Sequence, residues 1–190
     1  MDLEKLKKLT DDLVRMPTEC EWIEFKQNFH SPEEIGERIS ALSNGACLHN
    51  QPFGYLVFGI EDGTHKVLGT NFKVKTHTKG NENLENWLAN RLSPRIDFAA
   101  YEFDYAEGMH ISMFMIPAAV DRPVDFLNTS YIRVGSVTRK LSEFSEKEGK
   151  IWRKSSGASF EKEIAKANVT ASDIVQLLST QTYFDLLKIP

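Results

Sequence analysis

The chain has 190 residues, of which 41% are hydrophobic and 26% are charged, and its formal net charge is −4 at pH 7. This length and composition are typical of one cored domain of about 150 residues with an appendage, and they exclude a disordered or collagen-like chain. The negative charge argues against a protein that coats nucleic acid through bulk electrostatic attraction.

The first part of the chain predicts helix, strand, helix and strand. Leucines at helical spacing predict a helix over residues 2–15, and Pro17 ends it because the residue before a proline leaves helical geometry. Residues 22–27 predict a strand. Ser31 caps the next helix, whose first turn carries a proline and two acids. The apolar run 54–60 predicts a strand buried on both faces in the middle of its sheet.

The middle of the chain predicts a helix and two pairs of strands. Residues 82–92 carry leucines and a tryptophan at helical spacing. Residues 96–105 and 109–116 predict a β-hairpin, because the second segment alternates cleanly and a glycine turn separates the two. Residues 124–127 and 131–134 predict another pair.

The strand at 131–134 leads into a basic segment. Burial of Ile132 and Val134 would turn Tyr131 and Arg133 outward. Residues 135–140 then predict a polar, basic loop, in which backbone amides, hydroxyls and cations are close enough to grip a phosphate. A solvated turn is an equally good interpretation of this loop.

A helix from about Ser142 to Arg153 closes the predicted domain. We expect an α/β fold, a mixed β-sheet with packed helices, over residues 1–153. A hinge rich in serine and glycine follows, and residues 154–190 predict a short helical extension. Its apolar ending suggests a downstream region of the same protein.

Missing signals exclude several classes of protein. No apolar run approaches the ~18 residues of a membrane span, and the charged first residues hold no signal core. Cys20 and Cys47 stand in no metal or redox spacing, so we expect reduced thiols, a cytoplasmic location and no membrane partner. The chain has no P-loop, so neither ATPase nor helicase activity is predicted, and its five histidines lack zinc-site spacing.

Charged residues occupy one face of the strand at 22–27. Side chains alternate along a strand, so Ile23 and Phe25 would face the core while Glu24 and Lys26 lie side by side on the open face. Such a pair is either an ordinary surface ion pair, which is the commoner case, or half of a site.

Three carboxylates are candidates for a common site. Asp62 follows the buried strand, with Glu61 as a substitute, and it would approach Glu24 if the two strands are neighbours. Glu19 would reach them from the preceding loop. An oxygen-only cluster of this kind suits Mg²⁺ or Mn²⁺, and such a metal can activate water against a phosphodiester. Spacing alone favours ordinary ion pairs, because acids are common at strand ends.

Lysines and arginines gather where acids are absent. The stretches between Asp62 and Glu82 and between Asp125 and Glu143 contain no acidic residue. We therefore predict a locally basic face that contacts nucleic acid. Its candidate residues are Lys26, Lys73, Lys75, Lys79, Arg133, Ser136, Thr138, Arg139 and Lys140.

Three segments of the chain, in order, resemble the signature of the Schlafen-type Alba domain. Residues 19–26 read Glu-Cys-Glu-Trp-Ile-Glu-Phe-Lys and resemble its Glu-Ser-x-x-x-Glu-Phe-Lys. Residues 39–44 and 54–63 resemble its Ala-Phe-Ala-Asn and Gly-Gly-x-Leu-x-x-Gly-Val-x-Asp. Residues 131–138 match its closing Tyr-x-Arg-x-Gly-Ser-x-Thr.

The resemblance implies an α/β domain associated with nucleic acid. In bacteria such domains often form the front half of longer proteins described as DNA-binding regulators or RecG-like helicases. In the animal relatives a three-acid metal site cleaves RNA. Matched position by position, that site would fall on Glu19, Glu24 and Asp62, with Lys26 beside it.

We therefore expect a domain that binds DNA or RNA, within a transcriptional regulator or a RecG-like or defence protein. The first alternative is a Mg²⁺- or Mn²⁺-dependent endoribonuclease, in which Glu19, Glu24 and Asp62 are both the metal ligands and the catalytic residues. The second alternative is a protein-interaction or dimerisation module in which these acids form ion pairs. The sequence leaves a homodimer open.

Overall fold

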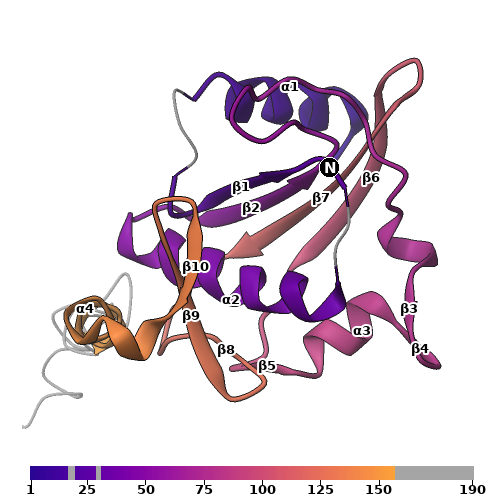
Figure 1. The fold of residues 1–190 in the computed structure, drawn as a ribbon. Coiled ribbons are helices and arrows are strands. Elements are labelled where there is room, and N and C mark those ends of the chain that lie inside the picture. The colour runs from indigo at the N-terminus through magenta and orange to yellow at the C-terminus, as the bar shows by residue number, and fades with distance from the viewer. Residues whose placement is uncertain (17–19, 29–30, 157–190) are drawn as a thin grey trace, which may run out of the picture. The chain divides into compact units, whose positions relative to one another are not determined.

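The computed structural model describes residues 1–16, 20–28 and 31–156 (Figure 1). The chain divides into two compact units, Met1–Gly157 and Ala158–Pro190, and the described residues all belong to the first. The helical extension predicted for residues 154–190 therefore lies, beyond Ser156, outside the described residues. Within the described part of the chain, no helix has both the length and the apolar character needed to cross a membrane.

A mixed four-stranded sheet forms the centre of this unit. Its order is β1-β2-β7-β6, where β1 is Ile23–Lys26, β2 is Phe53–Phe58, β7 is Met109–Pro117 and β6 is Ala99–Ala106. Strands β1 and β2 are parallel, and helix α2 (Pro32–Leu48) connects them, whereas β7 pairs antiparallel with both β2 and β6. The predicted neighbourhood of the first strand and the buried strand is confirmed.

A second sheet has the order β10-β9-β8-β5. Its strands are Val137–Lys140, Thr129–Val134, Asp125–Phe126 and Leu92–Ser93, respectively. The prediction of a polar loop over residues 135–140 is wrong, because Val137–Lys140 pairs antiparallel with β9. Gly135 has a φ of 61°, which suits the tight turn of a two-residue hairpin, so the chain reverses at once and the basic segment becomes an edge strand.

The other elements agree with the predicted order but differ in their bounds. Helix α3 is shorter than the predicted helix over residues 82–92, because the side chain of Asn83 caps it by accepting a hydrogen bond from the amide of Glu85. The final helix begins three residues later than predicted, after a 3₁₀ turn. The remaining elements are α1 (Leu3–Val14), the 3₁₀ turn Val74–Thr76, β3 (Thr78–Lys79), β4 (Glu82–Asn83), α3 (Leu84–Ala89), the 3₁₀ turn Leu141–Glu143 and α4 (Ser145–Ser156).

Two apolar cores cover the two faces of the first sheet, and Figure 1 shows α1 and α2 on opposite sides of it. On the α1 side, Leu6 and Leu13 belong to the same buried cluster as Ile23 and Phe25, as the alternation of the first strand predicted. On the α2 side, a larger cluster includes Ile39 and residues of both sheets. Each cluster removes apolar surface from water, which is the main driving force for folding.

Polar side chains of α2 attach the second sheet to this helix. The buried amide of Asn44 donates to the carbonyl oxygens of Val124 and Tyr131, at 3.0 and 2.9 Å, and accepts from the amide of Val124 at 2.8 Å. Ser40 donates to the carbonyl of Val124 and accepts from the amide of Tyr131. These bonds hold β9 against α2, and they thereby position Arg133, which follows Ile132 on that strand.

Candidate functional site

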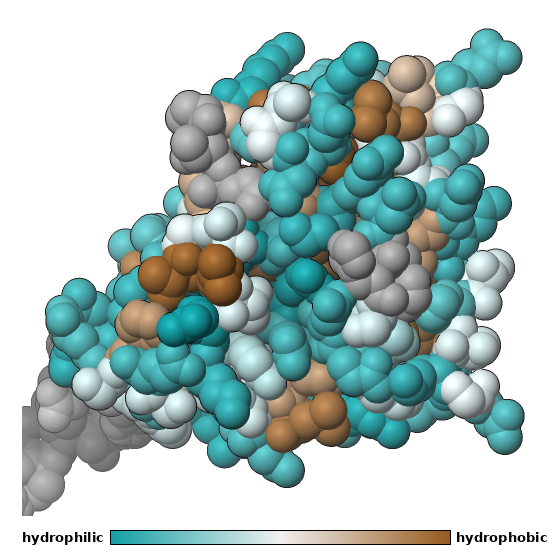
Figure 2. Space-filling view, in the orientation of Figure 1, coloured by the Kyte–Doolittle hydropathy of each residue, from teal (hydrophilic) through white to brown (hydrophobic). Residues whose placement is uncertain are grey.

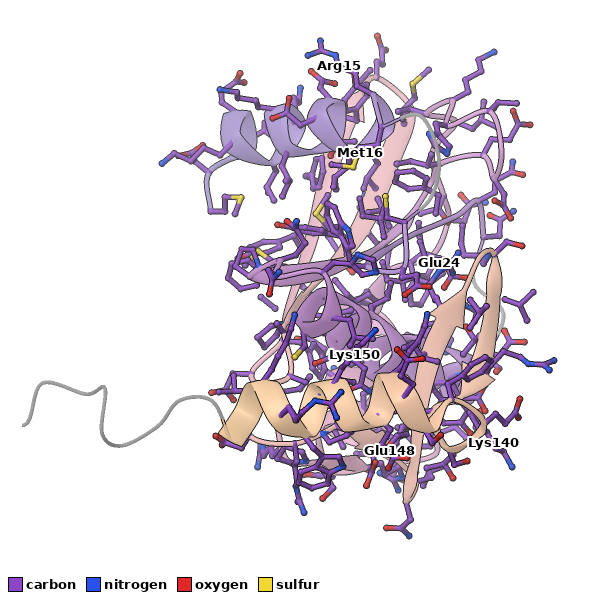
Figure 3. The ribbon with its side chains drawn as sticks, turned by 90° about the vertical axis from the view of Figure 1, so that its left-hand side faces the viewer. Arg15, Met16, Glu24, Lys140, Glu148 and Lys150 are labelled. Carbon is purple, nitrogen blue, oxygen red and sulfur yellow. The ribbon has the colours of Figure 1, made fainter. Side chains whose placement is uncertain are left out.

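Glu24 lies at the meeting point of three elements. Strand β1 directs its side chain toward α2 and β9, and the residue is only 2% exposed. Figure 3 shows Glu24 between β1 and the β9–β10 hairpin. The prediction that Glu24 lies on an open face is wrong, because α2 and the hairpin cover this face of the strand.

Three cations surround the Glu24 carboxylate. Its Oε1 lies 2.9 Å from Nε of Arg38 and 3.2 Å from Nζ of Lys26, and its Oε2 contacts the guanidinium of Arg133. Arg133 is fully buried, so the prediction that it turns outward from β9 is wrong. A buried charge requires partners of this kind, since an isolated carboxylate would be strongly disfavoured away from water.

The charge state of Glu24 follows from this environment. Burial acts to raise its pKa, but the charges of Arg133, Arg38 and Lys26 outweigh burial and hold the pKa below its usual range. Glu24 is therefore ionised at neutral pH. The cluster joins one anion to three cations, and together they connect the first sheet, α2 and the second sheet.

Asp62 joins this cluster from its exposed side. Its Oδ2 lies 3.5 Å from Nζ of Lys26, and its side chain is 63% exposed. The two carboxylates predicted to converge, those of Glu24 and Asp62, thus contact the same ammonium group. Lys26 is itself largely buried, with 17% of its side chain exposed.

The described carboxylates do not form an open set of metal ligands. No group of three or more His, Cys, Asp or Glu side chains that could hold a metal ion occurs in the described ranges. Glu19, the third predicted acid, lies outside them. Since the Lys26 ammonium contacts both Glu24 and Asp62, a Mg²⁺ or Mn²⁺ ion shared by these acids would have to displace it.

Arg38 is a member of the cluster that sequence reasoning missed. It also lies 3.3 Å from Oε2 of Glu34, one helical turn before it on α2. The i, i+4 spacing of these two residues is visible in the sequence and indicates an ordinary helix ion pair. Nothing in that spacing predicts the second and shorter contact, with Glu24.

One of the predicted lysines, Lys79, lies near the start of α2. Lys79 on β3 pairs with Glu33, with 2.8 Å between Nζ and Oε1, and its Nζ lies 5.9 Å from the centre of the Trp87 ring. Lys73 and Lys75 are exposed and flank Val74 in the 3₁₀ turn. Because Glu33 is adjacent to Glu34, the first two turns of α2 connect Lys79 to the Glu24 cluster.

The other predicted contacts lie on the β9–β10 hairpin. Ser136 is in its turn, and Thr138, Arg139 and Lys140 follow on the edge strand β10, where all but the half-buried Thr138 are exposed. Arg139 pairs with Glu143, with 3.3 Å between Nε and Oε2. Figure 3 shows Lys140 away from Glu24, close to the start of α4.

Apolar side chains accompany these cations. Val134 and Val137, on either side of the hairpin turn, are 36% and 51% exposed. Figure 2 shows an apolar patch on the hairpin within a face that is mostly hydrophilic. The tip of the hairpin is thus apolar, whereas the end of β10 is basic.

Comparison with known proteins places these features in context. The family model described as Schlafen, AlbA_2 matches residues 19–142, which agrees with the resemblance in the sequence. No curated protein matches the chain. Among solved structures, the crystal structure of the DIP2311 protein from Corynebacterium diphtheriae is similar, with 19% sequence identity and a TM-score of 0.41. The similarity covers 72% of this chain and 26% of that one, so this chain spans about a quarter of its length.

Proposed function

This chain belongs to the Schlafen, AlbA_2 family, whose functions are related to nucleic acid, and from that membership we propose that its α/β unit binds DNA or RNA. The finer role that we propose is that of a transcriptional regulator or of a RecG-like or defence protein, in which this unit supplies the nucleic-acid contact. The partner is thus a polyanion, and the binding surface must offer exposed cations and hydrogen-bond donors.

The observation that carries the proposal is the composition of the β9–β10 hairpin. Its edge strand presents the exposed side chains of Arg139 and Lys140, and the hydroxyls of Ser136 and Thr138 precede them. Cations and hydroxyls are the usual side-chain partners of phosphate oxygens. An edge strand keeps them accessible, because its outer side pairs with no other described strand.

The remaining candidates divide into two groups. Lys73, Lys75 and Lys79 are exposed or half-exposed and would extend the contact toward the start of α2. Arg133 and Lys26 instead belong to the buried cluster around Glu24. We propose that these two act on binding indirectly, by holding the hairpin and β1 together.

A salt titration of binding tests the proposal. Wild-type protein should lose affinity for duplex DNA steeply as salt rises, and each phosphate contact contributes about 0.9 to the slope of log K against log salt. The double variant Arg139→Ala/Lys140→Ala should reduce that slope by roughly 1 to 2. The control Lys5→Ala/Lys8→Ala removes two exposed cations from α1, on the other face of the first sheet, and should leave the slope unchanged. Failure of wild type to bind any nucleic acid at low salt would contradict the proposal.

A second candidate is the Mg²⁺- or Mn²⁺-dependent endoribonuclease with Glu19 as the third acid, because Glu24 and Asp62 approach the same point, where the metal would replace the Lys26 ammonium between them. Asp62→Asn is the informative variant, because Asp62 is exposed and its substitution should leave the fold intact. Loss of Mn²⁺-dependent RNA cleavage in this variant would support the candidate. Equal cleavage by wild type and variant would remove Asp62 from the site.

A further inference from the structure

Two polar cavities lie next to each other at the carboxyl ends of β1 and β2. The first has a volume of about 380 Å³ and is lined by Asn28, Asn71, Phe72, Lys73, Thr76 and His77. The second, of about 290 Å³, shares Asn28 and Asn71 with the first. Helix α2 connects these parallel strands, and the carboxyl ends of strands so connected are where α/β sheets commonly bind ligands.

Backbone hydrogen bonds fix the segment of residues 68–73, which lines both cavities. The amides of Leu68 and Gly69 both donate to the carbonyl of Gly59, at 2.9 Å, and the amide of Thr70 donates to the carbonyl of His110 at 2.8 Å. Gly69 has a φ of 82°, and a Cβ added there would lie 2.9 Å from the Cα of Met109.

The next residues of this segment are fixed as well. The hydroxyl of Thr70 accepts from the amide of Phe72, and the carbonyl of Phe72 accepts from the buried hydroxyl of Ser112. Asn71 therefore projects from a backbone that is held on both sides. A site of this kind loses little conformational entropy when a ligand binds.

The lining of the first cavity matches the chemistry of a nucleotide. The primary amides of Asn28 and Asn71 each offer donors and an acceptor, the combination that pairs with the edge of a base. The half-buried ring of His77 offers aromatic surface and packs edge-on against the buried ring of Phe72, with centres 5.6 Å apart, and Lys73 supplies a cation for a phosphate. The volume lies within the range of roughly 300–1,000 Å³ that is typical of ligand sites.

We propose that the two cavities hold consecutive unpaired nucleotides of a single strand, with Lys73 beside a phosphate and Asn28 and Asn71 against base edges. The inference rests on the proposed function and names its substrate class. In a duplex the Watson–Crick edges are already hydrogen-bonded and the bases are stacked inside the helix. A cavity that forms hydrogen bonds with these edges therefore selects unpaired strands. The two cavities therefore give the protein a preference for single strands over duplexes, which the cations of the hairpin alone would not provide.

The test compares a labelled single-stranded oligonucleotide with a blunt duplex of the same sequence, using the full chain and fluorescence anisotropy. Asn71→Ala removes no charge, so it should weaken binding of the single strand about tenfold while duplex binding and the salt slope stay unchanged. Lys73→Ala should also weaken single-strand binding and reduce the slope by about 0.7. Asn81→Ala, at an exposed asparagine that lines neither cavity, should have no effect.

Each adverse outcome has a distinct meaning. Unchanged single-strand binding by Asn71→Ala, or an equal loss of duplex binding, would overturn the inference. The proposed function would still stand if Arg139→Ala/Lys140→Ala weakened both substrates. Absence of binding by wild type to either substrate at low salt would end both proposals. A nucleoside monophosphate that bound as tightly as the strand would also overturn the inference, in favour of a site for free nucleotides.

Discussion

At the scale of single residues, Glu24 determines how the site is held together. Its carboxylate contacts the side chains of Arg133, Arg38 and Lys26. A buried ion pair adds little stability relative to apolar residues of the same shape, but loss of one partner leaves the other charge buried and uncompensated. The cluster thus connects the two sheets, and removal of its buried anion should be strongly destabilising.

Glu24→Gln should lower the free energy of unfolding at pH 7 by about 3–5 kcal/mol, measured in urea. The pKa of Glu24 is lower in the folded protein than its ordinary value of 4.5. Ionised Glu24 therefore stabilises the folded state above about pH 4.5, and this stabilisation is lost as the pH falls through the folded pKa. The difference between wild type and variant should shrink accordingly as the solution is acidified.

The control for this prediction is Glu34→Gln, which removes the other, more exposed carboxylate from Arg38. It should change the unfolding free energy by less than about 1 kcal/mol and keep the acid dependence of wild type. A constant difference between wild type and Glu24→Gln from pH 7 to pH 3 would show that the Glu24 carboxylate is not stabilised by its three cations.

The sequence predicts which residues share a face of a strand but not what covers that face. Alternation correctly assigned Ile23 and Phe25 to the core. It wrongly left Glu24 and Arg133 in solvent, because charged residues on strands are usually exposed and only their mutual pairing makes burial tolerable. That pairing depends on β9 lying over α2, an arrangement for which a single sequence carries no local signal.

At the scale of elements, close contact between α2 and the chain before β1 depends on a glycine. A Cβ added at Gly45 would collide with the backbone carbonyl oxygen of Glu21, three residues before Glu24. Backbone atoms cannot rotate away as a side chain does. The glycine therefore sets how closely the helix approaches the segment that leads into β1.

Gly45→Ala should destabilise the protein by about 1–3 kcal/mol, as overpacking usually does, although alanine is the better helix former. Gly149→Ala is the matched control, since a Cβ there first meets the end of the flexible Arg153 side chain, at 3.4 Å. That substitution should stabilise α4 by roughly 0.5–1 kcal/mol. Thermal unfolding of both variants checks the prediction, and stabilisation by both would refute the assigned contact.

Elements with strong local signals were predicted well. Ser31 and the proline after it predicted the start of α2, and the structure confirms it, with the Ser31 hydroxyl accepting from the amide of Glu34. The edge strand β10 was missed because the residues after Gly135 are mostly polar and basic and do not show the pattern of a strand. Its backbone pairing with β9 stabilises it as a strand instead. Both cavities were missed for a similar reason, since they join residues after β1 to residues about 40 positions later.

At the scale of the whole molecule, the first compact unit contains both apolar cores and the cations of the proposed nucleic-acid interface. The buried residues of its two cores run from Leu6 to Ile151, and the cations of the proposed interface lie between Lys73 and Lys140. A chain that ends after Gly157 should therefore unfold in one cooperative transition and keep the salt-dependent binding of the full chain. Coincident near-ultraviolet and far-ultraviolet circular dichroism transitions would measure this.

A second truncation, after Glu143, removes α4 and serves as the comparison for this prediction. It would expose the partners of the buried Ile151 and remove Lys147, whose Nζ lies 2.6 Å from Oε1 of Glu21. It would also remove Lys154 of α4, which donates to the carbonyls of Cys47 and Leu48 at the end of α2. The last turn of α2 has no basic residue of its own, so Lys154 supplies the cation at the negative end of that helix dipole. We expect the two probes to diverge in the shorter chain; if they coincide, α4 is dispensable and the domain ends before it.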